Sequence, residues 1–286
     1  MTYQTMDVRP IAGALGAEIY GANLKDRDDS PVWQELRQAF LEYMVIAIRG
    51  QDLGPADIMR IGAKFGEPAH YPFAKGMDEF PYITRVVKEK DQREAFGNNW
   101  HSDTVYIDKP PRATLLYAVE TPPKGGDTIF ANTAAAYDGL SAGMKKLIEG
   151  LVGVNSGGLK NRRGGPRKAH FAGIGGGMAL QNSENADAFE SRHPIVRTHP
   201  DTGRKSLYVT ALHTLRLDGM TEEESRPLIQ YLNDRCIENE YTCRVRWKPG
   251  QLTIWDNRCT MHNAINDYHG ERREMYRLIS GPEVPV

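Results

Sequence analysis

A histidine and an aspartate stand two residues apart near the end of the first third of the chain. His101 and Asp103 follow Trp100, and the residues after them alternate in the manner of a strand. Side chains at positions i and i+2 of a strand point to the same face. This spacing therefore lets an imidazole and a carboxylate converge on one metal ion. An isolated pair of this kind is more often part of a half-exposed surface strand, so the motif needs further ligands elsewhere in the chain.

The stretch from residue 255 to residue 280 supplies a second histidine and two arginines. Arg273 follows His262 by eleven residues, and Arg277 lies four residues beyond it. Two imidazoles and one carboxylate form the facial triad of non-haem Fe(II) oxygenases, which leaves open metal positions for a co-substrate and oxygen. An α-keto acid bound to such a metal needs a counter-charge for its distant carboxylate. The planar guanidinium of Arg273 suits that task, and the Thr128 hydroxyl would add a donor.

The order and spacing of these motifs resemble the taurine dioxygenase family. The segments are Trp-His-Ser-Asp at 100–103, Gly-Gly-Asp-Thr at 125–128 and Trp-Asp-Asn-Arg-x-x-x-His at 255–262, with two arginines at 272–273. The resemblance runs from about Val8 to the C-terminus, and the family includes phenoxyalkanoate and alkylsulfate dioxygenases. It implies an oxidoreductase that depends on Fe(II), 2-oxoglutarate and O2. Such an enzyme hydroxylates a C–H bond of a small anionic organic substrate, of the sulfonate, alkyl sulfate or aryloxyalkanoate type, and releases succinate and CO2.

The resemblance also implies roles for individual residues in three groups. These are the iron ligands His101, Asp103 and His262, the 2-oxoglutarate contacts Thr128 and Arg273, and the substrate contacts Arg277, His70, Asn98, Tyr71 and Phe73. Taurine enzymes carry an asparagine at the position of Gly97 and use it on the substrate. This departure argues against taurine as the substrate here.

Strand-like segments dominate the rest of the chain. They are short, rich in β-branched and aromatic residues, and bounded by Gly, Pro or Asp: 45–50, 114–120, 127–132, 206–210, 241–247, 251–257 and 273–280. Capping signals and periodicity predict helices over 30–44, 54–66, 133–151 and 221–238. Strands and helices do not alternate regularly, which favours a mainly β, antiparallel jelly roll with flanking helices over a parallel sheet. The resemblance makes this a cupin-like double-stranded β-helix.

The bulk properties predict a soluble, cytoplasmic protein. The chain has 286 residues and a formal net charge of −1, which gives no bulk attraction to nucleic acid or membranes. Its start lacks a secretion signal, it has no long apolar run, and its three cysteines suggest a reduced compartment. We expect one domain over residues 1–286 and, from the family, a homodimer or homotetramer. The Gly-rich stretch at about 155–190, with five basic residues in 160–168, is interpreted as a lid.

Three other interpretations remain open at this point. A metal-dependent hydrolase would use the triad but leave Arg273 and Thr128 without a role. A non-catalytic jelly-roll protein would bind metal and keto acid without turnover. A nucleophile built on Cys259 and His262 is the weakest of the three. The Gly-rich segment 173–180 resembles a dinucleotide loop, but no predicted strand precedes it.

Overall fold

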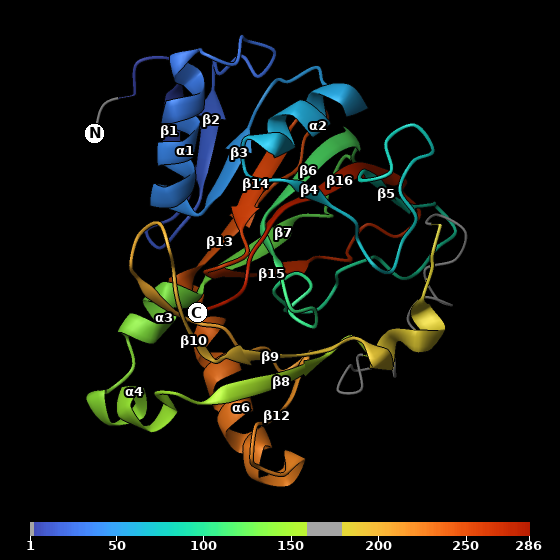
Figure 1. Ribbon diagram of the computed structural model, residues 1–286. Coiled ribbons are helices and arrows are strands. Elements are labelled where there is room, and N and C mark those ends of the chain that lie inside the picture. Colours follow the sequence, from blue (N-terminus) through green and yellow to red (C-terminus); the bar gives the residue numbers. More distant parts are fainter. Residues whose placement is uncertain (1–2, 159–178) are drawn as a thin grey trace.

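A large, mostly antiparallel sheet forms one wall of the molecule (Figure 1). The structure is a computed structural model that describes residues 3–158 and 179–286. The order of the strands is β1-β2-β3-β14-β6-β16-β4, β5 also pairs with β16, and only the β2–β3 pair is parallel. Their bounds are β1 Asp7–Pro10, β2 Ala17–Tyr20, β3 Val45–Ile48, β4 Pro68–Ala69, β5 Thr84–Lys88, β6 Pro111–Glu120, β14 Leu252–Asp256 and β16 Arg273–Pro282.

A second, three-stranded sheet packs against the large one. Its order is β13 (Thr242–Val245), β7 (Thr128–Asn132) and β15 (Thr260–Ala264). Phe130 and Val245 of this sheet share one apolar cluster with Leu116 and Met275 of the large sheet. Two smaller sheets complete the fold: β8 (Val152–Ser156) between β9 (Glu190–Pro194) and β12 (Thr214–Leu217), and β10 (Val196–Thr198) with β11 (Lys205–Leu207). The prediction of a mainly β jelly roll is confirmed.

Strands of the large sheet are buried on both faces, which explains their nearly continuous apolar sequences. In β3, Val45 and Ala47 point into the space between the two sheets, whereas Ile46 and Ile48 point toward the helices. Side chains that alternate along a strand reach opposite faces. By the same rule, Arg273 and Arg277 of β16 share the inner face with Met275. The inner face is therefore where the polar residues of the predicted site meet.

The helices cover the outer faces of the sheets (Figure 1). Helices α1 (Pro31–Tyr43) and α2 (Pro55–Ala63) pack on the large sheet, and α6 (Glu222–Cys236) packs near the second one. Ser30 caps α1, and a capping box between Thr221 and Glu224 starts α6, as predicted. Short 3-10 helices span Ser183–Ala188 and Asn239–Tyr241.

The prediction of one helix over 133–151 is wrong. The segment forms two helices, α3 (Thr133–Asp138) and α4 (Ala142–Ile148). Helix α3 stops at Gly139, and the Ser141 side chain accepts a hydrogen bond from the Met144 N–H to begin α4. Glycine weakens a helix interior and serine competes for backbone donors, so the break lies where those residues occur.

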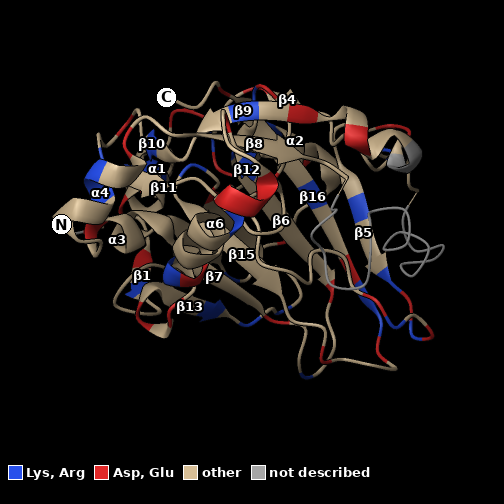
Figure 2. Cartoon of the chain, turned by 90° about the horizontal axis from the view of Figure 1, so that it is seen from below, with Lys and Arg blue, Asp and Glu red and all other residues tan. Residues whose placement is uncertain are grey.

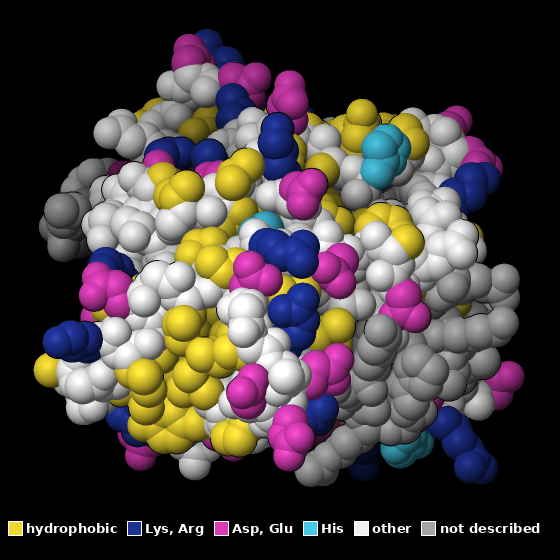
Figure 3. Space-filling model, turned by 60° about the horizontal axis from the view of Figure 1, so that its bottom comes forward, with side chains coloured by type: hydrophobic (Ala, Val, Ile, Leu, Met, Phe, Trp, Pro, Cys, Tyr) yellow, Lys and Arg dark blue, Asp and Glu magenta, His cyan; other side chains and the backbone are white. Residues whose placement is uncertain are grey.

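Charged residues of both signs are interspersed over the molecule. Figure 2 shows basic and acidic residues mixed along the chain, and Figure 3 shows the same mixture, together with apolar patches, on the face that it presents. No helix within residues 3–158 and 179–286 has the length and apolar composition to span a membrane. The basic segment 160–168 and most of the predicted lid lie outside the described residues. The lid therefore stays a prediction, as does the single domain.

Candidate active site

His101, Asp103 and His262 meet at one buried point between the two sheets. Their ligand atoms all lie within 4.8 Å of one another, and the His101 Nε2 to Asp103 Oδ1 distance is 3.8 Å. His262 lies in the middle of β15, and a single antiparallel bridge joins its backbone to that of His101. This bridge brings together two segments that are 161 residues apart in the sequence (262 minus 101).

 The expected strand over His101 and Asp103 is not present. Beyond the bridge at His101, residues 103–106 form a turn, in which Thr104 has a positive φ of 50°. An angle near 50° belongs to the left-handed region and turns the chain directly after Asp103, so the two side chains converge without the alternation of a strand. The prediction of a strand here is wrong, although the two side chains do converge.

Hydrogen bonds and burial prepare both imidazoles to bind a metal. The His101 Nδ1 lies 2.6 Å from the Asn99 carbonyl oxygen. A carbonyl only accepts, so Nδ1 carries the proton and Nε2, which faces Asp103, keeps its lone pair. Burial, followed by the charge of His101, lowers the pKa of His262 to about 3, so this ring is neutral at pH 7. The His262 Nδ1 is buried without a hydrogen-bond partner among the described residues.

The Asp103 carboxylate is ionised and held from two sides. Burial alone would raise its pKa, but Arg277, the two imidazoles and Thr114 together hold the pKa well below its usual range. The Thr114 hydroxyl donates to Oδ2 over 2.7 Å and accepts from the Asn257 amide over 2.8 Å. Asn257 thereby fixes the direction in which Thr114 donates. Oδ1 lies 2.8 Å from Nη2 of Arg277.

A cavity extends from the three ligand side chains to Arg273. Its walls combine apolar and polar side chains: Val86, Phe96, Gly97, His101, Asp103, Leu116, Thr128, Trp255, His262, Ala264, Arg273 and Arg277. Arg273 is 5% exposed, and no carboxylate of the described residues pairs with it. Burial lowers its pKa, which Tyr268 partly offsets, but an arginine stays charged at neutral pH. The cavity therefore presents a buried cation that has no carboxylate partner among the described residues.

Of the other residues predicted to contact substrate, Tyr71 contacts a residue of the cavity wall, whereas His70 and Asn98 do not line the cavity. The Tyr71 ring is buried, with the Arg277 guanidinium 4.6 Å from its centroid, and Phe73 packs behind it. His70 is exposed and stacks on Tyr82, and neither it nor Asn98 lines the cavity. Asn98 donates a hydrogen bond to Glu94.

Gly97 does line the cavity, and its position bears on the expected departure from taurine enzymes. A Cβ at this position would lie 3.6 Å from Cε1 of His101. A side chain here would therefore reach the metal-ligand cluster. Its φ of +80° also favours glycine. The glycine leaves space beside His101 and has no side-chain amide to offer a substrate.

Two residues near the cluster escaped sequence reasoning. The buried His213 ring lies 6.3 Å from that of His101 and 5.0 Å from that of Tyr106, and its Nδ1 bonds to the Ser156 carbonyl. Trp247 donates from Nε1 to the Thr128 hydroxyl over 3.0 Å. Neither residue stands in a motif with a chemical signature, and only the folded chain brings them to the site.

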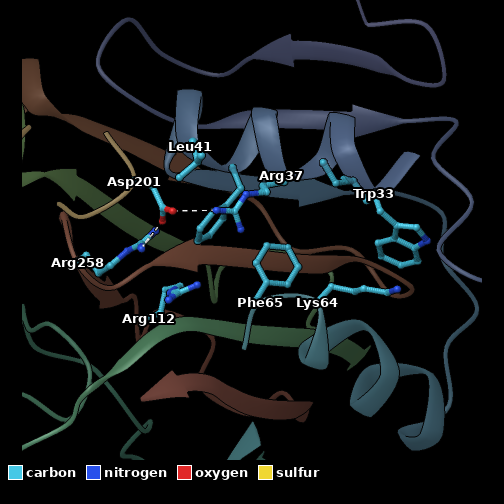
Figure 4. Close-up of a pocket in the computed structure, with 10 residues that line it drawn as sticks. Trp33, Arg37, Leu41, Lys64, Phe65, Arg112, Asp201 and Arg258 are labelled. Atoms are coloured by element: carbon cyan, nitrogen blue, oxygen red, sulfur yellow. Dashed lines mark hydrogen bonds and ion pairs between the residues drawn. The ribbon is translucent and has the colours of Figure 1, made fainter. Parts of the chain in front are cut away.

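A second group of potential metal ligands, His199, Asp256 and Cys259, lies elsewhere. Here the Asp256 carboxylate already accepts hydrogen bonds from His199 and from Arg258, whose side chain is fully buried. Figure 4 shows Arg258 and Arg37 of α1 reaching Asp201 from two sides. The cluster is an ion-pair network that ties α1 to the turn between β14 and β15, and so supports the strand that carries His262.

The same network argues against a nucleophile at Cys259. Burial and the neighbouring Asp256 charge raise the pKa of this thiol well above its ordinary value. A reactive cysteine needs the opposite, a stabilised thiolate with access to substrate.

Comparison with known proteins identifies the family. Residues 7–279 match the model of the "Taurine catabolism dioxygenase TauD, TfdA family". The chain belongs to this family. An alkylsulfatase of Acinetobacter baylyi is 33% identical over 98% of this chain and 86% of its own, and an alpha-ketoglutarate-dependent sulfate ester dioxygenase of Pseudomonas putida is 31% identical over 98% and 91%.

Solved structures agree with this membership in the TauD/TfdA family. A taurine dioxygenase from Burkholderia xenovorans superimposes with a TM-score of 0.81 at 29% identity, over 99% of this chain and 91% of that one. The protein is accordingly an oxidoreductase, a dioxygenase that depends on Fe(II), 2-oxoglutarate and O2. The recognition of this family from the spacing of its motifs is confirmed.

Proposed function

We propose that this dioxygenase hydroxylates small sulfate esters, with His101, Asp103 and His262 as the iron ligands. The arrangement of these three side chains supports the proposal, because they meet at one buried point where the His262 imidazole is uncharged and the Asp103 carboxylate is ionised. Two nitrogens and one oxygen are a donor set that suits Fe(II) and leaves positions open. The His262 Nδ1 has no hydrogen-bond partner among the described residues, and the lowered pKa of Asp103 keeps its carboxylate ionised. Both features fit a site that binds a cation. Bound iron would supply the oxygen chemistry that attacks a C–H bond.

Arg273 and Thr128 would hold the distal carboxylate of 2-oxoglutarate. The buried guanidinium lacks a counter-anion among the described residues, and a carboxylate supplies one with two parallel hydrogen bonds. Both residues line the same cavity as the metal ligands, so a diacid bound at one end would present its keto group at the other. The role of the protein is to orient the co-substrate and to exclude water from the space between the sheets.

Arg277 would bind the sulfate group of the substrate. Its guanidinium is buried, stacks over Tyr71 and pairs with Asp103 in the present structure. When Asp103 binds a metal ion, the metal neutralises much of the carboxylate charge, so the Arg277 guanidinium can pair with an anion in the cavity. Hydroxylation of the carbon next to the ester oxygen would give an unstable product, which collapses to an aldehyde and inorganic sulfate. The two relatives named for sulfate esters, and Gly97 in place of the taurine enzymes' asparagine, favour this class over taurine.

The experiment is a substrate panel with the purified protein. Alkyl sulfates of graded length, taurine, other sulfonates and aryloxyalkanoates are each incubated with Fe(II) and 2-oxoglutarate, with and without oxygen, while succinate, aldehyde and sulfate are measured. We expect succinate, aldehyde and sulfate in equal amounts from an alkyl sulfate, in oxygen only. Release of sulfate without oxygen would instead indicate a metal-dependent hydrolase. Keto-acid binding without any turnover on the panel would favour the non-catalytic alternative.

We also infer that the enzyme acts in the cytoplasm as a homodimer or homotetramer and that the chain is one domain. The three cysteines are free and buried, which suits a reducing compartment. Light scattering of the purified protein gives the oligomeric state, and a mass near 32.1 kDa would identify a monomer and contradict this inference.

A further inference from the structure

We propose that Trp247 is a positioning residue for 2-oxoglutarate, which acts by fixing the direction of the Thr128 hydroxyl proton. The inference rests on the proposed co-substrate site and adds a residue to it. Trp247 follows β13, in which Val245 pairs directly with Thr128 of β7. This register places the indole beside the threonine, where Nε1 donates to Oγ1 over 3.0 Å. Trp247 is buried, with 8% of its surface exposed.

The direction of this hydrogen bond determines what Thr128 can do. An indole N–H only donates, whereas a hydroxyl has one proton and two lone pairs. Because Oγ1 accepts from Trp247, its own proton must point elsewhere. Within the described part of the chain no hydrogen bond from the Thr128 hydroxyl to a protein acceptor is present. The proton is therefore available to a ligand in the cavity that Thr128 lines.

The neighbouring Arg273 also has a hydrogen-bond donor that a ligand in the cavity could satisfy. A guanidinium has donors only, and its Nε is buried without a partner. Its Cζ lies 5.5 Å from the centre of the Trp247 ring, so the indole both orients Thr128 and packs against the arginine. Thr128 and Arg273 thus line the same cavity, and within the described residues no carboxylate pairs with the guanidinium. A carboxylate, which only accepts when ionised, satisfies both.

A double-mutant cycle tests the role of the indole N–H. Trp247→Phe keeps a ring next to Arg273 but removes the donor, and Thr128→Val removes the hydroxyl. Binding of 2-oxoglutarate to the Mn(II)-loaded holoprotein, which is measured by calorimetry, should weaken about fivefold in the Phe variant. The Val variant should weaken it about tenfold. The double variant should match the Val variant, because the indole has no hydroxyl left to orient.

Selectivity for the second carboxylate provides an independent readout. The Phe variant should bind 2-oxobutyrate, which lacks the distal carboxylate, as the wild type does. Thr128→Ser retains the hydroxyl and should retain sensitivity to Trp247→Phe. Trp33 lies on α1, outside the cavity, and its indole donates a hydrogen bond to the Arg27 carbonyl, so Trp33→Phe serves as the matched control. If Trp247→Phe does not fold, the indole N–H signal of the Zn(II)-loaded wild type should shift with 2-oxoglutarate and not with 2-oxobutyrate.

The outcomes separate this inference from the proposed site. An unchanged affinity in Trp247→Phe, or a loss that is equally large in the Thr128→Val background, overturns the role of Trp247 alone. An equal loss for 2-oxobutyrate does the same, since it would indicate a general structural defect. If Thr128→Val and Arg273→Met both leave 2-oxoglutarate binding unchanged, the co-substrate site itself is wrong and the inference falls with it.

Discussion

Replacement of Arg273 by methionine should have opposite effects on stability and on co-substrate binding. The guanidinium is 5% exposed and pairs with no carboxylate of the described residues, so its charge is only partly compensated by Tyr268 and Trp247. Methionine keeps an unbranched apolar stem of similar reach and removes the charge. The ligand-free protein should therefore become more stable, while 2-oxoglutarate loses the partner of its distal carboxylate.

The burial of the Arg273 charge sets the size of the expected changes in unfolding free energy and in 2-oxoglutarate affinity. An incompletely compensated buried ion costs several kcal/mol before relaxation, so we expect a gain of about 1–2 kcal/mol in the free energy of unfolding. For a chain of this size that corresponds to an increase in Tm of about 2 °C or more. Loss of one partner from a buried charge pair costs about 2–5 kcal/mol in binding. This range corresponds to an affinity about 30-fold to several thousandfold weaker.

The assay combines thermal unfolding with calorimetric titration of 2-oxoglutarate into Mn(II)-loaded protein. Metal affinity should change little, because the ion pair to the ligand Asp103 comes from Arg277 and not from Arg273. The neighbouring Arg272 provides a matched control, since it directly precedes β16, does not line the cavity, and pairs with Glu89, Glu120 and Glu274. Arg272→Met should leave 2-oxoglutarate binding unchanged. A less stable Arg273→Met protein with normal co-substrate affinity would refute the reasoning and make Arg273 a structural residue.

Three further predictions concern the residues around the metal ligands. His262→Ala should abolish activity and remove Mn(II) binding in calorimetry, whereas full turnover in this variant would contradict the metal assignment. Thr114→Val should weaken metal binding by about 10–100-fold through loss of the hydrogen bond to Asp103, and unchanged affinity would show that this bond does not matter. Asp256 should link stability to pH: burial alone would raise its pKa, but Arg258 and His199 lower it to about 2. Its stabilisation, about 2 kcal/mol, is present above pH 3.8 and lost as the pH falls toward 2. Acid titration of the wild type and of Asp256→Asn should show this loss in the wild type only, and identical slopes would contradict it.

Much of the site could be predicted from the sequence because its residues stand in motifs with fixed spacing. Arg273 and Arg277 are an even number of residues apart on one strand, so alternation alone brings both to the inner face. The position of His262 in a strand of its own was less accessible. Strand β14, in the large sheet, ends at Asp256, and β15, in the second sheet, begins at Thr260. The three residues between them, 257–259, have no strong turn signature, so the sequence does not show that the chain changes sheets here.

Other features depend on contacts between distant segments. Local sequence indicated a strand at His101, but the bridge to His262 and the turn at Thr104 arise from tertiary structure. Strand β5, which pairs with residues Arg273 to Arg277 of β16, is only five residues long and was not predicted. His213 and Trp247 have no sequence signal for function, since their roles depend on neighbours more than 100 residues away.

In the proposed site, two side chains from the first half of the chain, His101 and Asp103, and one near its end, His262, hold the same iron ion. A crystal structure of the protein with Mn(II) and N-oxalylglycine, with anomalous scattering recorded at the manganese edge, tests this claim most directly. We predict one metal peak within bonding distance of His101, Asp103 and His262, with the distal carboxylate of the ligand against Arg273. A metal peak elsewhere, or a ligand bound with its distal carboxylate away from Arg273, would contradict the account.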